Sequence, residues 1–122
     1  MSNLIVIAPE MHKIAELAVN VQYRYPGNVV SQIPVEFEIF VVNNYFKAVP
    51  LHTHESKQLT DLPDELFFQV KDGVLHIYNA GTTKIIETIV QKLVNCGAFE
   101  SPQKPLRVRL AKGEVPKGRR YA

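Results

Sequence analysis

Hydrophobic and polar residues alternate along two stretches in the middle of the chain, and this period of two predicts a pair of β-hairpins. Residues 35–51 are predicted to form the first hairpin and to turn at Asn43-Asn44, because asparagine tolerates the positive φ that a two-residue turn needs. Residues 65–78 form the second hairpin and turn at Asp72-Gly73, which is a strong hairpin signal. Each hairpin then has one face for the core and one face that points away from it.

The faces that point away from the core carry many apolar side chains. Pairing outward from the turns places Val42 opposite Tyr45 and Phe67 opposite Tyr78. The apolar residues of this face are Phe40, Val42, Tyr45, Val49, Phe67, Val74 and Tyr78. Three explanations remain open: an interface with a partner or a second copy, cover by the C-terminal tail or a loop of the same chain, or a surface that stacks nucleobases.

Helical spacing replaces the alternation in two other segments. Residues 9–23 predict a first helix with Pro9 in its first turn, and its apolar face consists of Met11, Ile14, Leu17, Ala18 and Val21. Residues 81–97 predict a second amphipathic helix, which Gly97 ends. Short apolar runs at residues 4–8 and 106–110 predict strands. The inward-pointing residues of the last strand would be Leu106, Val108 and Leu110.

The resulting element order is β-α-ββ-ββ-α-β. It predicts an α+β fold in which two helices cover one face of a mostly antiparallel sheet of about six strands. A ferredoxin-like core with an inserted hairpin has this outline. We expect residues 1–112 to form a single domain, since 122 residues with 46% hydrophobic content suit one core. Residues 113–122 are predicted to form a basic C-terminal arm, in which Gly113, Pro116 and Gly118 oppose regular structure.

Positive charge is concentrated at the C-terminal end of the chain. Residues 104–122 contain seven lysines and arginines against Glu114 alone, a net charge of +6, whereas residues 1–103 contain seven basic and eleven acidic residues, a net charge of −4. A basic end of this kind attracts phosphates or an acidic protein surface, and the alternative is a solubilising tail. The predicted partner-binding residues are Phe40, Tyr45, Phe67, Tyr78, Arg107, Arg109, Lys117, Arg119, Arg120 and Tyr121.

Residue types that support catalysis or metal binding form no motif in this sequence. His52 and His54 have an H-x-H spacing that can supply two metal ligands, but no third ligand stands at a meaningful spacing, so they are weak candidates. Cys96 follows the apolar stripe of the second helix and is expected to pack against it. Phosphate-binding loops and nucleophile elbows are missing from the sequence. We therefore expect no catalytic residue, no cofactor, no bound metal and no enzymatic activity.

These observations favour a non-catalytic binding or assembly subunit that docks a macromolecular partner through the aromatic sheet face and the basic arm. A virion component, a ribonucleoprotein component and a small viral inhibitor are examples of such a subunit. The partner is predicted to be a protein or a second copy of the chain. The alternative is a nucleic-acid-binding domain that uses the same arm and aromatic residues, and a small metal- or His-dependent hydrolase is the third hypothesis.

The cellular setting is predicted from cysteine usage and from the distribution of apolar residues. The chain has one cysteine, which fits a reducing compartment. Its first apolar run has no basic segment before it and ends at Pro9, so we expect no signal peptide. No apolar run has the length of a membrane span. The sequence thus predicts a soluble, intracellular protein, cytoplasmic or incorporated in a larger particle, without membrane contact.

Overall fold

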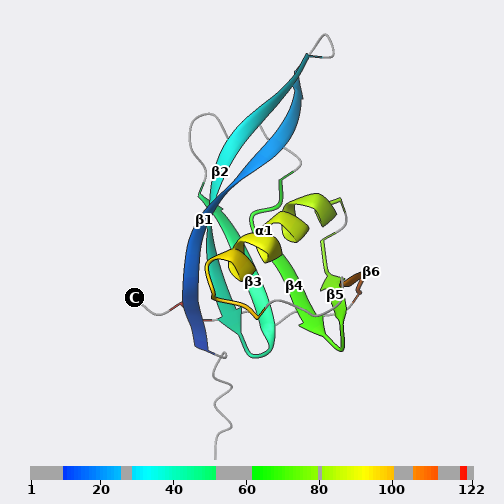
Figure 1. The fold of residues 1–122 in the computed structure, drawn as a ribbon. Coiled ribbons are helices and arrows are strands. Elements are labelled where there is room, and N and C mark those ends of the chain that lie inside the picture. Colours follow the sequence, from blue (N-terminus) through cyan, green and yellow to red (C-terminus); the bar gives the residue numbers. More distant parts are fainter. Residues whose placement is uncertain are drawn as a thin grey trace, which may run out of the picture.

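The computed structural model describes residues 10–25, 29–51, 62–79, 81–100, 106–112 and 119–120. They form one sheet of seven strands, in the order β6-β5-β4-β3-β2-β1-β7, and one helix. The elements are β1 (Glu10–Tyr25), β2 (Val29–Val42), β3 (Tyr45–Leu51), β4 (Leu66–Lys71), β5 (Val74–Ile77), α1 (Thr83–Asn95), β6 (Arg107–Leu110) and β7 (Arg119–Arg120). Figure 1 shows α1 lying across one face of the sheet, and β1 and β2 continuing together as a long two-stranded ribbon beyond the other strands.

The predicted α+β fold with two helices in the order β-α-ββ-ββ-α-β is wrong. In the described part of the chain, five strands precede a single helix and two strands follow it, so the fold is β-rich. The sheet is mixed, because β7 joins β1 and β6 joins β5 in parallel while the other neighbouring strands are antiparallel. This order differs from that of a ferredoxin-like core. The strand predicted at residues 4–8 lies outside the described residues.

The helix predicted over residues 9–23 is instead strand β1, which pairs with β2 along its length. A bulge at Ile14 adds one residue to β1 and shifts the side-chain alternation by one. Met11, before the bulge, belongs to a cluster on the face away from α1, whereas Val19 and Val21, after it, belong to the core under α1. Ile14, at the bulge, and Ala18 are exposed, so two of the five apolar positions that suggested helical spacing do not belong to the core face of this extended strand.

Both predicted hairpins are confirmed, with their turns and their registers. The turn residues Asn43 and Asp72 have φ values of 53° and 54°, in the left-handed region that asparagine and aspartate tolerate. The observed partners match pairing outward from each turn, as shown by Val42 with Tyr45, Ile39 with Ala48 and Gln69 with His76. Short-range turn chemistry is thus sufficient to specify these two hairpins.

Helix α1 covers the sheet with its predicted apolar stripe. Ile86, Ile89 and Leu93 are completely buried, and Gly97 follows the helix with a φ of 80°, as a C′ glycine does. The strand residues in the same core are Val19, Val21, Ile33, Val35, Phe37, Ile39, Ala48, Leu66, Phe68, Leu75 and Ile77. Each large side chain that is fully buried contributes roughly 1.5–3 kcal/mol, so this layer supplies much of the stability. We call the opposite side of the sheet the outer face.

The C-terminal part of the chain lies at both edges of the sheet, because β6 forms one edge and β7 the other. Strand β6 confirms the strand predicted at residues 106–110, but its predicted burial is wrong: Val108 and Leu110 are 42% and 58% exposed. In the part of the chain that the structure describes, β6 has a neighbouring strand on one side only, and its apolar side chains are poorly covered. Within the predicted arm, residues 119–120 form β7, and residues 113–118 and 121–122 lie outside the described residues.

Candidate functional site

The centre of the outer face is a small apolar cluster that consists of Met11, Phe40 and Val42, with Val49 packed against it. Phe40 is 2% exposed and Val42 is completely buried. Phe67, on the same face, is 7% exposed. Little of either phenylalanine ring is available to a partner in this conformation, so a docking surface on this face has to use the residues around the cluster.

Lys47 places a positive charge in the buried part of the outer face. Its side chain is 9% exposed, and its Nζ lies 2.9 Å from Oε1 of Glu65. The same Nζ lies 5.7 Å from the centre of the Phe67 ring. Because a buried ammonium group is costly without a partner, the carboxylate and the aromatic ring together make this position tolerable. We assign Lys47 a structural role beside the site.

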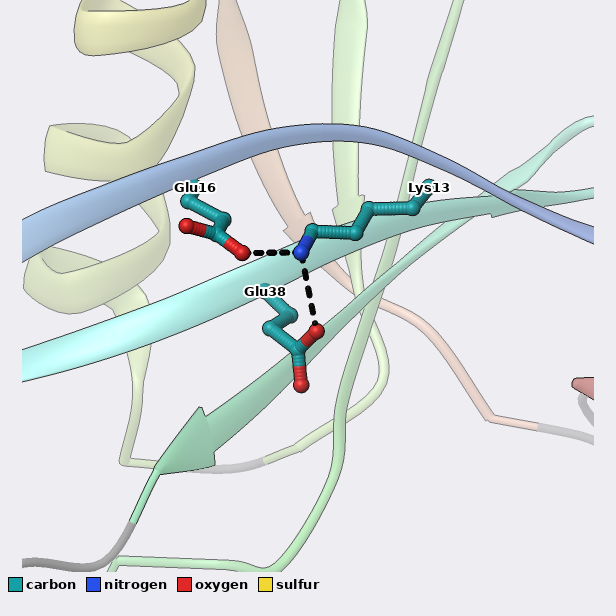
Figure 2. A network of polar contacts seen from close by, with 3 residues as sticks. All are labelled: Lys13, Glu16 and Glu38. Carbon is teal, nitrogen blue, oxygen red and sulfur yellow. Dashed lines mark hydrogen bonds and ion pairs between the residues drawn. The ribbon is translucent and has the colours of Figure 1, made fainter. Parts of the chain in front are cut away.

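Lys13 joins two carboxylates on the β1–β2 side of the outer face, as Figure 2 shows. Its Nζ contacts Glu16 and lies 3.1 Å from Oε2 of Glu38, whose side chain is 10% exposed. Hydrogen bonds to Glu16 and then to Glu38 raise the pKa of Lys13 above its usual value. This network links the two strands, and its three residues together carry one net negative charge.

Tyr45, on β3, and Tyr78, just after β5, meet over the intervening strand β4. Their ring centres are 5.4 Å apart and the rings are tilted by 60°. The Tyr78 hydroxyl donates a hydrogen bond of 3.5 Å to the Tyr45 hydroxyl. This hydrogen bond and partial burial raise the pKa of Tyr78 to about 12, whereas the positive charge of Arg109 acts in the opposite direction. Both tyrosines are half-exposed. Because its pKa is about 12, the Tyr78 hydroxyl is neutral at physiological pH.

Strand β6 brings two arginines beside this pair. Arg107 is in register with Val74, and Arg109 is in register with His76. Since residues in register on neighbouring strands point to the same side of a sheet, both arginines lie on the outer face, where they are exposed. We call the group of Tyr45, His76, Tyr78, Arg107 and Arg109 the tyrosine–arginine surface.

The structure separates the predicted partner-binding residues into groups. It brings four of them together in the tyrosine–arginine surface, namely Tyr45, Tyr78, Arg107 and Arg109. It places Phe40 and Phe67 in the buried part of the outer face. The backbone of Arg119 and Arg120 forms β7 at the far edge of the sheet. The residues that lie outside the described part are Lys117 and Tyr121, and also the weak metal candidates His52 and His54.

His76 is not among the predicted partner-binding residues, and the contact between Tyr45 and Tyr78 is not predicted either. The alternation along the second hairpin already placed His76 and Tyr78 on the same face. The contact with Tyr45 depends on the register between β3 and β4, which pairs Phe46 with Phe68. No turn of two residues joins these strands, so their register could not be counted from a turn.

Other groups that could support chemistry are dispersed. Among the described residues, no three His, Cys, Asp or Glu side chains are grouped so as to hold a metal ion. Cys96 is exposed instead of packed, and its Sγ donates to the Leu93 carbonyl oxygen over 3.4 Å. A hollow of about 250 Å³ is lined by Glu16, Leu17, Ala18, Glu36, Phe37 and Leu51. Its lining combines two carboxylates with apolar groups and does not match a reaction type.

Comparisons of the chain with protein-family models, with curated proteins and with solved structures find no match. In the part of the chain that the structure describes, no helix is long and apolar enough to cross a lipid bilayer. The function is therefore inferred from the tyrosine–arginine surface itself.

Proposed function

We propose that this chain is a non-catalytic binding or assembly subunit that docks a partner protein through the tyrosine–arginine surface. The observation that carries this proposal is the position of the hydrogen-bonded pair Tyr45 and Tyr78 beside Arg107 and Arg109 on an exposed part of the sheet. Tyrosine and arginine are enriched at protein interfaces, because they combine a large contact area with directional hydrogen-bond donors.

The geometry of the surface also lowers the cost of binding. The contact between the two rings limits their rotation before a partner arrives, so less side-chain entropy is lost on association. The planar guanidinium groups of the two arginines can form paired hydrogen bonds with carboxylates. An acidic partner surface with one or two apolar contacts for the tyrosine rings would fit these groups.

The proposal is tested with charge and ring variants in extracts of the native host. Wild type, Arg109→Glu, Tyr78→Ala and the control Lys92→Glu, an exposed position on α1, are each used to capture partners after nuclease treatment. Mass spectrometry identifies the captured proteins, and thermal melting verifies that each variant is folded. We expect wild type and Lys92→Glu to capture the same protein, and the two surface variants to lose at least tenfold of it.

Equal capture by all four proteins would refute the proposal. If nuclease treatment removes the bound material, the alternative of nucleic-acid binding is favoured, and its affinity must then fall steeply with salt concentration because phosphate contacts release counterions.

A further inference from the structure

Among the described residues, strand β6 is an exposed edge of the sheet, and it carries the two arginines of the tyrosine–arginine surface. It is the terminal strand beyond β5, and all four of its residues are exposed. Val108 and Leu110 are 42% and 58% exposed, so both apolar side chains are accessible to a partner. An open strand edge is a template on which another extended chain can pair.

The backbone groups that point outward from β6 follow from its pairing with β5. The N–H of Arg107 donates to the carbonyl of Gly73 over 3.1 Å, and the N–H of Ala111 donates to the carbonyl of Ile77 over 2.8 Å. Successive residues of a strand direct their N–H and C=O groups to opposite sides, so Val108 and Leu110 direct theirs away from β5. These two residues provide the hydrogen-bonding groups of the open edge.

The side chains of β6 differ in character between the two faces of the sheet. Arg107 and Arg109 lie on the outer face with Val74 and His76. Val108 and Leu110 are in register with core residues Leu75 and Ile77, so they lie on the face that α1 covers. A strand added beside β6 would therefore meet positive charge on one face and apolar side chains on the other.

We propose that β6 binds an extended segment of a partner protein as an additional strand, and that acidic and apolar residues alternate in this segment. The inference rests on the proposed docking function and specifies the partner's chemistry. The acidic side chains would lie beside Arg107 and Arg109, and the apolar ones would cover Val108 and Leu110. Charged edge residues discourage indiscriminate pairing, and here the arginines select against basic strands.

A second copy of the chain fits this edge less well than an acidic partner. In an antiparallel pairing of two β6 strands centred on Val108, Arg107 of one copy would lie opposite Arg109 of the other. Like charges directly opposite each other destabilise a strand pair. We therefore assign the edge to a different protein and treat self-association as a result that would contradict the assignment.

The test uses Val108→Pro, because proline removes the outward N–H of this residue while the bonds from β6 to β5 come from its neighbours. Val108→Thr is the matched control, since it retains both the N–H and the β-branched shape. The probe is a labelled synthetic peptide of eight residues that alternates glutamate and valine, compared with its lysine–valine counterpart. Fluorescence anisotropy measures the binding of each peptide to the full chain.

We expect wild type and Val108→Thr to bind the glutamate–valine peptide at least tenfold more tightly than Val108→Pro does. The double variant Arg107→Glu with Arg109→Glu should bind the lysine–valine peptide more tightly than the glutamate–valine peptide. If Val108→Pro fails to fold, the same question is asked of wild type with a peptide that is N-methylated at alternate residues, which should bind at least tenfold more weakly. Equal binding of the methylated and unmethylated peptides, or of the glutamate–valine and lysine–valine peptides, overturns the proposal. The proposal is also overturned if the wild type sediments as a dimer and Val108→Pro sediments as a monomer.

The host-extract capture distinguishes this proposal from the broader one. Capture that persists in Val108→Pro but is lost in Arg109→Glu refutes strand addition and supports docking through the tyrosine–arginine surface. If none of these variants changes the capture, both strand addition at β6 and docking through the tyrosine–arginine surface are refuted. Loss in Val108→Pro, with retention in Val108→Thr, supports both.

Discussion

The hydroxyl of Tyr78 lies 3.5 Å from the hydroxyl of Tyr45, although 33 positions separate the two residues in the chain and β4 lies between their strands. Neither hairpin holds both residues, so the contact forms only when β3 and β4 are correctly aligned. The tyrosine pair thus reports on the assembly of the whole sheet, and it can be followed by titration.

The first prediction concerns the ionisation of Tyr78. Its pKa is raised from the ordinary value of 10.0 to about 12, mainly by the hydrogen bond to Tyr45. An ultraviolet absorbance titration of the five tyrosines should show one group that ionises near pH 12. Tyr78→Phe should remove that group, and Tyr45→Phe should lower its pKa toward 10. An unchanged titration curve in Tyr45→Phe would contradict the assigned cause.

The same shift predicts how stability depends on pH. Because the folded-state pKa of Tyr78 exceeds the unfolded value, the neutral hydroxyl stabilises the fold at pH values below about 10. This contribution disappears as the pH rises through about 12. Denaturant unfolding of wild type and Tyr78→Phe across this window should show a steeper loss of stability in the wild type, whereas parallel curves would exclude a linked ionisation of Tyr78.

The second prediction concerns the ion pair between the buried Lys47 and the exposed Glu65, whose charged atoms are 2.9 Å apart. Glu65→Gln should lower the free energy of unfolding by about 1–3 kcal/mol, because it leaves a buried ammonium group without its carboxylate. Lys47→Met should cost less than about 1 kcal/mol, since methionine fills similar space without a charge to desolvate. Urea unfolding of both single variants and of the double variant measures the coupling between the two residues. A double variant in which the two effects simply add would show that the pair is not coupled.

Local chemistry was enough to predict the hairpins and α1 because each depends on neighbours in the sequence. Asn43 and Asp72 specify turns, and a two-residue turn then fixes the strand register by counting. In α1, the buried residues Ile86, Ile89 and Leu93 recur at helical spacing and Gly97 ends the helix. These elements required no knowledge of the rest of the chain.

The parts that could not be predicted depend on long-range pairing. Residues 10–25 suit a helix only if Ile14 and Ala18 are counted as core residues, whereas pairing with β2 leaves both exposed and buries Val19 and Val21. The exposure of Val108 and Leu110 follows from the position of β6 at the edge of the sheet. The order of strands in a sheet cannot be predicted from the residue pattern of one strand. The tyrosine–arginine surface likewise needs β3, β4, β5 and β6 to be adjacent. Its residue types were visible in the sequence, but their proximity was not.

The third prediction concerns the turn between β2 and β3. Of its two residues only Asn43 has a positive φ, of 53°, which a β-branched side chain strongly disfavours. Asn43→Val should destabilise the fold by about 1–2 kcal/mol, whereas Asn43→Gly should change stability by a few tenths only. Asn44→Val is the control at the neighbouring position. Thermal or urea unfolding should rank Asn43→Val below all three other proteins, and equal values for the two valine variants would contradict the strained turn.

The fourth prediction concerns α1, which is the structural support beneath the docking surface. Ile89 is completely buried in the core between α1 and the sheet, so Ile89→Ala should cost about 2–5 kcal/mol of unfolding free energy. Glu87→Ala, on the exposed side of the same helix, should change stability by less than about 0.5 kcal/mol. We expect α1 to stabilise the sheet without setting its alignment. The Ile89→Ala variant, measured at a low temperature at which it is folded, should then retain the Tyr78 ionisation near pH 12. Loss of that ionisation in a folded variant would show that the helix also determines the alignment of β3 with β4.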